Sequence, residues 1–357
     1  MVIPSNKKTK HLIIKSLDFI GAFFIFSVIS LIALMNYKIF CLLLCLSFCC
    51  GAFAQSHSTE IGAQTDNDSY LAQGSDRYYT DGIFIYYRHG LKVDDKSKLQ
   101  NKVLGFEFGQ KIYNPQIGSI ANDQGVDQPQ YIDRPFAAYL YVGSTLNFLY
   151  KDESNLKLGA QIGVVGPAAL GKQIQDFVHD NFGFYHPSGW EYQIDNNVEL
   201  NLSAEYNKLL AKGSWIDVSL TSYANLGNGF SGAGVGPLFR LGDFNQLFNS
   251  VSTQSTAIQS SNYTRLHPHE LFFYYKPQIN LVAYDATIQG SLFGSKSANS
   301  MEITLDPERF IFSNQLGIGY SGKRFVLDAA AIFHTKDVKQ MVQSHQWGTV
   351  TLLYRFN

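Results

Sequence analysis

One stretch of the chain, QIQDFVHDNFG at residues 173–183, has helical spacing in a sequence that otherwise alternates like β-sheet. Four apolar side chains are expected to share one face of this helix: Ile174, Phe177, Val178 and Phe182. Gln175 and His179 lie one turn apart at the border of that face. A neutral histidine can deprotonate water near neutral pH, so His179 is a candidate general base that Gln175 could orient. The alternative is an ordinary surface histidine.

Two other segments carry oxygen-bearing side chains. TDNDSY, residues 65–70, offers the oxygens of Asn67 and Asp68, which are ligands that calcium prefers. The alternative for this segment is a simple turn, because Asn and Asp side chains bond their own backbone. DRYYTDG, residues 76–82, places the hydroxyl of Thr80 in a possible site. The alternative there is that Thr80 is simply a residue well suited to a strand.

Strands must position these residues, because period-two alternation recurs along the chain. Val198, Leu200 and Leu202 alternate with polar residues and are expected to face lipid. Such alternation predicts an all-β fold, a 12-stranded antiparallel transmembrane β-barrel with a short extracellular-loop helix over residues 167–183. A soluble β-sandwich is the alternative. The twelve predicted strands are 57–66, 80–90, 102–112, 136–150, 154–166, 189–208, 213–225, 230–241, 269–286, 309–321, 324–336 and 345–356.

The first 54 residues are expected to be a leader that is not part of the fold. From Met35 the sequence has a short polar region, an apolar core and a small-residue cleavage site ending at Ala54, as in a secretory signal peptide. The segment before Met35 is either a mis-assigned start or a membrane anchor. Residues 55–357 then form a single barrel domain. All four cysteines lie in the leader, so this domain has no disulfides.

Composition supports a membrane protein and excludes some partners. The chain has 27 Phe and 21 Tyr, and aromatic side chains gather at membrane interfaces in outer-membrane barrels. Its formal net charge of −1 gives no indication of nucleic-acid binding. No segment after the leader approaches the ~20 apolar residues that a membrane helix needs.

Five short motifs occur in an order that resembles the outer-membrane lipid A 3′-O-deacylase (LpxR) family. The resemblance covers most of the chain after the leader and is densest from Thr65 to Gln193. The motifs are N-D at 67–68, D-R-Y-Y-T-D-G at 76–82, I-Y-N-P at 112–115, G-V-V-G-P-x5-Q-x-Q-x3-H at 163–179 and G-W-x2-Q at 189–193.

This resemblance implies a 12-stranded barrel whose active site lies between the wall and a helix from an extracellular loop. It also implies calcium and a mechanism like that of secreted phospholipases A2. Carried over by motif, His179 matches the base that activates water, Gln175 the polar residue one turn earlier, and Thr80 the site threonine. Asn67 and Asp68 match the pair associated with the metal site.

Two departures from the family pattern, and one from the usual end of a barrel's last strand, stand out. Some members have a functional lysine after the I-Y-x-P motif, whereas this chain has none between Tyr113 and Arg134. Tyr185 stands where an acidic residue can follow the histidine by six positions. The chain ends on Asn357 rather than on an aromatic residue. Recognition of the lipid's phosphate or sugar is therefore expected to differ.

The resulting prediction is a calcium-dependent lipid A 3′-O-deacylase in the bacterial outer membrane. It would act as a monomer on lipopolysaccharide and release the 3′ acyl group. One alternative is an outer-membrane phospholipase A, which would need a serine nucleophile, and no serine here lies in a recognisable motif beside His179. The other alternative is a non-enzymatic pore or adhesin barrel, whose activity would survive loss of His179.

Overall fold

The computed structural model describes residues 57–71, 76–116, 119–259, 263–294, 296 and 298–356. The predicted leader, residues 1–54, lies outside this part of the chain. Within the described residues, no helix has the length and apolar composition needed to cross a membrane.

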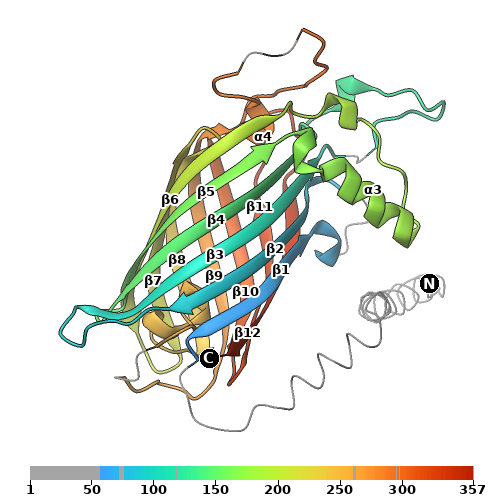
Figure 1. Ribbon diagram of the computed structural model, residues 1–357. Helices are drawn as coiled ribbons and strands as arrows, with labels where there is room; N and C mark the ends of the chain where they lie inside the picture. The colour runs from blue at the N-terminus through green and yellow to red at the C-terminus, as the bar shows by residue number, and fades with distance from the viewer. Residues whose placement is uncertain are drawn as a thin grey trace, which may run out of the picture. The chain divides into compact units, whose positions relative to one another are not determined.

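Twelve antiparallel strands close into a barrel in which each strand pairs with its neighbours in sequence and β1 pairs with β12 (Figure 1). The predicted 12-stranded barrel is therefore confirmed. The strands are β1 Thr59–Asn67, β2 Tyr78–Gly90, β3 Leu99–Asn114, β4 Ala137–Tyr150, β5 Ser154–Val165, β6 Asn197–Lys212, β7 Ile216–Gly227, β8 Phe230–Asp243, β9 Glu270–Asp285, β10 Phe310–Ser321, β11 Phe325–His334 and β12 His345–Phe356.

The alternation in sequence becomes an alternation between the two sides of the barrel wall. On β6, Val198, Leu200 and Leu202 are each about 60% exposed on the outside, as predicted: 63%, 61% and 59%. Glu199 and Asn201, which alternate with them, are buried toward the lumen. Successive side chains of a strand point to opposite faces, so an apolar outside and a polar inside require this period of two.

The helix α3 and most of the long connections lie at one end of the barrel, here called the α3 rim (Figure 1). The predicted helix over 167–183 is a 3₁₀ turn, η3, followed by α3. The segment 189–196, predicted as strand, instead contains a 3₁₀ turn, η4, so β6 begins at Asn197. The helices are η1 Asp68–Leu71, η2 Pro129–Tyr131, η3 Pro167–Ala169, α3 Gly171–Phe182, η4 Trp190–Tyr192, η5 Leu247–Asn249, η6 Val251–Thr253 and α4 Ala286–Gln289.

The connection between β8 and β9 folds into the barrel at the end opposite α3, and we call its residues 244–258 the plug. Its apolar side chains pack with inward-facing residues of the wall: Phe244 and Val251 join one buried cluster, and Phe248 and Ala257 another. Asn101 on β3 donates hydrogen bonds to three carbonyl oxygens of the plug, each at 3.0–3.1 Å. The plug therefore occupies the lumen at this end.

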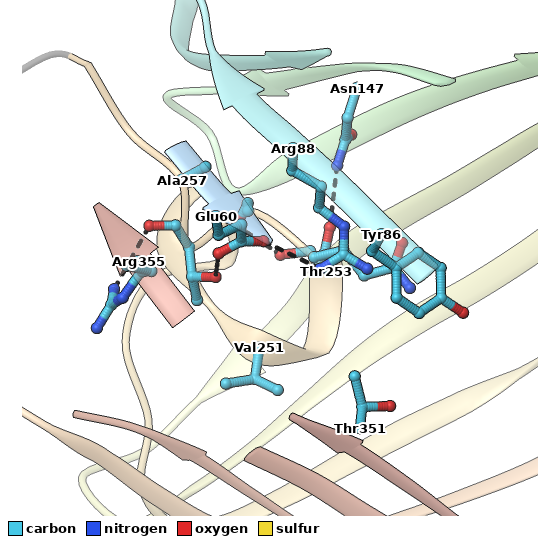
Figure 2. A network of polar contacts seen from close by, with 12 residues as sticks. Glu60, Tyr86, Arg88, Asn147, Val251, Thr253, Ala257, Thr351 and Arg355 are labelled. Atoms are coloured by element: carbon cyan, nitrogen blue, oxygen red, sulfur yellow. Dashed lines mark hydrogen bonds and ion pairs between the residues drawn. The ribbon is translucent and has the colours of Figure 1, made fainter. Parts of the chain in front are cut away.

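Charged and polar side chains of the wall also hold the plug. Figure 2 shows Glu60 on β1 between Arg88, which donates to it at 3.0 Å, and the hydroxyl of Thr256 in the plug, which donates at 2.6 Å. In the same network, Asn147 donates to the carbonyl of Thr253 at 2.9 Å. Because a buried carboxylate is stable only with partners, the plug and the wall depend on each other for these bonds.

The alternation of side chains on β6 predicts how a charge on each face of this strand changes the stability of the barrel. Leu202→Arg should destabilise the barrel in lipid vesicles by about 2–4 kcal/mol, because it places a cation in the apolar part of the bilayer. Ser203→Arg, one residue away on the lumen side, should cost clearly less. Urea unfolding followed by tryptophan fluorescence measures both. Equal costs at the two positions would contradict this register.

Candidate active site

The start of β2 departs from regular strand geometry. Tyr78 has a φ of 59°, which is rare for a residue with a side chain. A register shift between Tyr79 and Asp81 leaves Thr80 without a partner on β3. Such bulges re-aim side chains and are frequent beside active sites. Thr80 is fully buried, and its hydroxyl finds no hydrogen-bond partner within the described residues.

The local sequence brings α3 very close to the wall. A Cβ at Gly171 would lie 2.5 Å from the Cβ of Ala138 on β4 and 2.7 Å from the ring of Trp190, so a larger residue could not approach so closely. Gly183 ends the helix with a φ of 70°, a conformation that glycine adopts easily. Between these two residues, the side chains of Gln175 and His179 are buried.

Asp76 lies at the centre of the site, and the sequence interpretation did not single it out. Its Oδ2 atom accepts hydrogen bonds from Nε2 of His179 at 2.8 Å and from Nε2 of Gln175 at 2.6 Å. Asp76 comes from the same DRYYTDG segment as Thr80. A carboxylate beside a candidate histidine base is a common pairing, so the segment itself held a signal for Asp76.

Gln175 contacts Asp76 rather than His179. Its side-chain oxygen accepts from Nδ2 of Asn114 at 3.1 Å and from the indole N–H of Trp190 at 2.8 Å. These two bonds fix the amide so that its nitrogen points at Asp76. Gln175 therefore positions the acidic partner of the histidine, and it acts on His179 only through that partner.

The second nitrogen of His179 is also occupied. Nδ1 lies 2.5 Å from the backbone carbonyl of Tyr185, and because a carbonyl only accepts, Nδ1 must carry the hydrogen. The rings of Tyr185 and Phe184 pack edge-on against the imidazole at 4.8 and 5.5 Å. Nε2 is thus the atom that can gain or lose a proton. The backbone of Tyr185 supports the histidine at the position where some family members have an acidic side chain.

The surroundings favour the protonated form of His179. Burial lowers the pKa of His179, but the hydrogen bond and negative charge of Asp76 and the carbonyl of Tyr185 raise it above the ordinary value of 6.5. When His179 is protonated, it forms an ion pair with Asp76 at 2.8 Å.

Asp68 is buried close to the acidic side chains of Asp76 and Asp81. Burial and the charges of Asp76 and Asp81 together raise the pKa of Asp68 to about 9, against the backbone N–H of Arg77, which lowers it. The carboxyl of Asp68 and the unpaired hydroxyl of Thr80 are hard oxygen donors, of the kind that calcium prefers.

Asn67 is engaged differently from Asp68. Its side-chain oxygen accepts from the backbone N–H of Ser69 at 2.7 Å, which is the turn interaction considered above. Its amide nitrogen donates to Asp81. In this arrangement Asn67 orients Asp81, and its oxygen would have to leave the turn to bind a metal.

The apolar residues predicted to share one face of α3 do not form its most buried side. Phe177 and Phe182 are 59% and 46% exposed, whereas Gln175 and His179 are nearly fully buried. Partners from distant segments, namely Asp76, Asn114 and Trp190, compensate the desolvation of these polar groups. The phenylalanine side chains consequently form an apolar surface around the outside of the site.

Comparisons with known proteins identify a family and similar folds. A family model described as "Outer membrane protein LpxR" matches residues 39–356. The structure of LpxR from Salmonella typhimurium is similar with a TM-score of 0.65 at 20% sequence identity, over 83% of this chain and 100% of that chain. The β domain of the Bordetella autotransporter BrkA gives a TM-score of 0.40 at 9% identity, over 84% and 100% of the two chains. No curated protein matches.

The matched region contains all twelve strands, α3 and every site residue described above. The match to this family model accounts for the resemblance that the five ordered motifs carry. The protein is a barrel of the bacterial outer membrane, and the chain belongs to the outer membrane protein LpxR family.

Proposed function

We propose that this protein is a calcium-dependent lipid A 3′-O-deacylase, which hydrolyses the ester-linked 3′ acyl group of lipopolysaccharide with His179 as general base. The observation that carries this proposal is the hydrogen-bonded group formed by His179, Asp76 and Gln175, with the buried Asp68 near Asp76. Family membership supports the substrate class, through the resemblance described for the five motifs.

The position of the site suits a substrate that stays in the membrane. Connections at the α3 rim are mostly the longer ones, as on the extracellular side of outer-membrane barrels. The rings of Phe177 and Phe182 on α3, and of Phe184 just after it, are exposed. An acyl chain could lie along these rings and the apolar wall while the ester reaches His179. The lipid would not need to leave the bilayer.

The chain's own residues can account for the proton transfers. Water attacks the ester carbonyl carbon while Nε2 of His179 takes its proton, which requires Asp76 to turn away from Nε2. The side chain of Asp76 is 20% exposed, so its carboxylate can turn toward solvent. The imidazolium then gives the proton to the sugar oxygen as the C–O bond breaks, leaving a fatty acid and a free 3′ hydroxyl group. Asp76 stabilises the imidazolium between these steps.

Asp68, Asp81 and the Thr80 hydroxyl would hold the calcium ion, which when bound supplies polarisation of the ester carbonyl. Asn67 would contribute through Asp81, which it already contacts. The Arg77 N–H, which donates to Asp68 at 2.9 Å, orients that carboxylate.

The two alternatives fit the structure less well. A phospholipase with a serine nucleophile would need a serine at His179, but the described side-chain and backbone partners of its ring nitrogens are Asp76 and Tyr185. A passive pore would need an open lumen, and the plug occupies it at the end opposite α3.

Replacing the base should remove the activity. His179→Ala should lower deacylation roughly 10²- to 10⁴-fold, the usual contribution of a general base, with the barrel still folded. Gln175→Ala should have a smaller effect, because it acts through Asp76. His186→Ala, an exposed histidine, is the control. Mass spectrometry of lipid A from expressing cells measures the effect, and wild-type turnover by His179→Ala would refute the mechanism.

The pH dependence of deacylation should show whether Asp76 is the partner of His179. The neutral form of His179 is the active base and its pKa is raised, so activity should fall as the pH drops through a value above 6.5. Asp76→Asn removes the main group that raises this pKa. The residual activity of that variant should therefore persist to lower pH than the wild type. The test is the deacylation rate of the purified wild type and variant, measured as a function of pH. If the loss of activity at low pH were the same in both, Asp76 would be excluded as the partner of His179.

Calcium should be required through the acidic cluster. A chelator should silence the purified enzyme, and added calcium should restore it, because the reaction needs a counter-charge for the developing oxyanion. Asp68→Asn should abolish activity or sharply raise the calcium concentration needed. Asp180→Asn, an exposed residue of α3, should leave the calcium dependence unchanged. Full activity after chelation would leave Asn67 and Asp68 as turn residues only.

A further inference from the structure

A second group of potential metal ligands lies at the α3 rim on other strands. His334 is the last residue of β11, His345 is the first residue of β12 and pairs with it, and Asp337 lies in the connection between them. One ligand atom from each of these residues lies within 4.8 Å of the others. We propose that His334, Asp337 and His345 form a binding site for a divalent transition metal, with zinc as the best fit.

The distances within the group suit a metal better than direct hydrogen bonds. Nδ1 of His334 and Nε2 of His345 each lie 3.5 Å from a different oxygen of Asp337. This separation is too long for a good hydrogen bond. Two ligands that bind one tetrahedral zinc ion at about 2.0–2.1 Å are separated by roughly 3.3 Å. Small side-chain shifts would therefore bring all three residues into coordination.

The group also contains buried atoms without a partner. His345 is 5% exposed, and neither of its ring nitrogens has a hydrogen-bond partner within the described residues. The same holds for Oδ1 of Asp337. Buried polar groups are normally satisfied, so an imidazole with two bare nitrogens next to a bare carboxylate oxygen calls for a ligand. A cation between them would satisfy the nitrogen and the oxygen together.

Neighbouring aromatic rings hold the two histidines in place. Trp347 packs edge-on against His334 at 4.8 Å and His345 at 5.2 Å, and the imidazoles stack at 5.5 Å. Two imidazoles and one carboxylate are ligands that suit zinc, whereas calcium prefers oxygen alone. Three protein ligands leave a fourth position for water.

The position of the group indicates a structural role for the metal. The same connection packs Val338 and Met341 against Tyr78. The hydroxyl of Tyr78 and the backbone N–H of Val342 both donate to Asp133, at 2.8 and 3.3 Å. Bound zinc would fix the β11–β12 connection and, through Tyr78, the start of β2. No residue is shared with the proposed calcium site, so the two proposals can fail independently.

Cobalt binding tests this proposal, because tetrahedral Co²⁺ absorbs visible light and replaces zinc at such sites. Chelator-treated, folded wild-type protein in detergent should bind one Co²⁺ with a tetrahedral spectrum, and Zn²⁺ should displace it. Zn²⁺ should also raise the thermal unfolding midpoint. Both effects should be lost in His345→Gln and in Asp337→Asn, which lies outside the strands and removes only a charge.

Two control variants make the result specific. His267→Gln changes a surface histidine that also lies near an aspartate, Asp243 at 3.7 Å, and should keep the Co²⁺ spectrum. His179→Ala should keep it as well. If Asp337→Asn kept the tetrahedral Co²⁺ spectrum, the metal would lie elsewhere and the proposal would be overturned. The same would follow if His179→Ala were the variant that lost the spectrum. Absence of Co²⁺ binding by the wild type would overturn it too.

Discussion

The site depends on one shared hydrogen-bond acceptor, Oδ2 of Asp76. It accepts from His179 and Gln175, so a single carboxylate joins two turns of α3 to the start of β2. Burying the polar side of a helix is unfavourable unless each group finds a partner. Asp76 is the partner that both side chains share. Asn114 and Trp190 supply the remaining hydrogen bonds to the side chain of Gln175. The orientation of the whole helix follows from these bonds.

This orientation gives the helix its outward apolar face. With Gln175 and His179 turned inward, Phe177 on the opposite side of the helix faces outward, and Phe182 at the end of α3 is exposed as well. In water such exposure would be unfavourable, but at the surface of a membrane an amphipathic helix is stabilised by lipid. The same geometry that buries a candidate base therefore surrounds it with a surface suited to acyl chains.

The barrel supplies the rigidity that this site needs. Closure of β1 on β12 leaves no free strand edge, and the plug ties the lumen side of several strands together. At the α3 rim the backbone is irregular where the site begins: Tyr78 adopts a positive φ and Thr80 lies in a bulge. A rigid wall can hold such residues in place, as strain at functional sites requires. The group of His334, Asp337 and His345 lies at the same rim, at the ends of the last two strands.

The sequence by itself determined the twelve strands and the presence of α3. A wall between lipid and a polar lumen imposes a period of two on every strand, and this pattern is local; the last strand was predicted with its observed bounds, 345–356. The turn at Asn67 is equally local. Tertiary structure alone decided which side of α3 is buried, because Asn114 and Asp76, which bind Gln175 and His179, lie 61 to 103 residues away in sequence. It also decided the role of Asp76 and the pairing of His334 with His345, since proximity between distant residues depends on how strands align and not on their spacing in sequence.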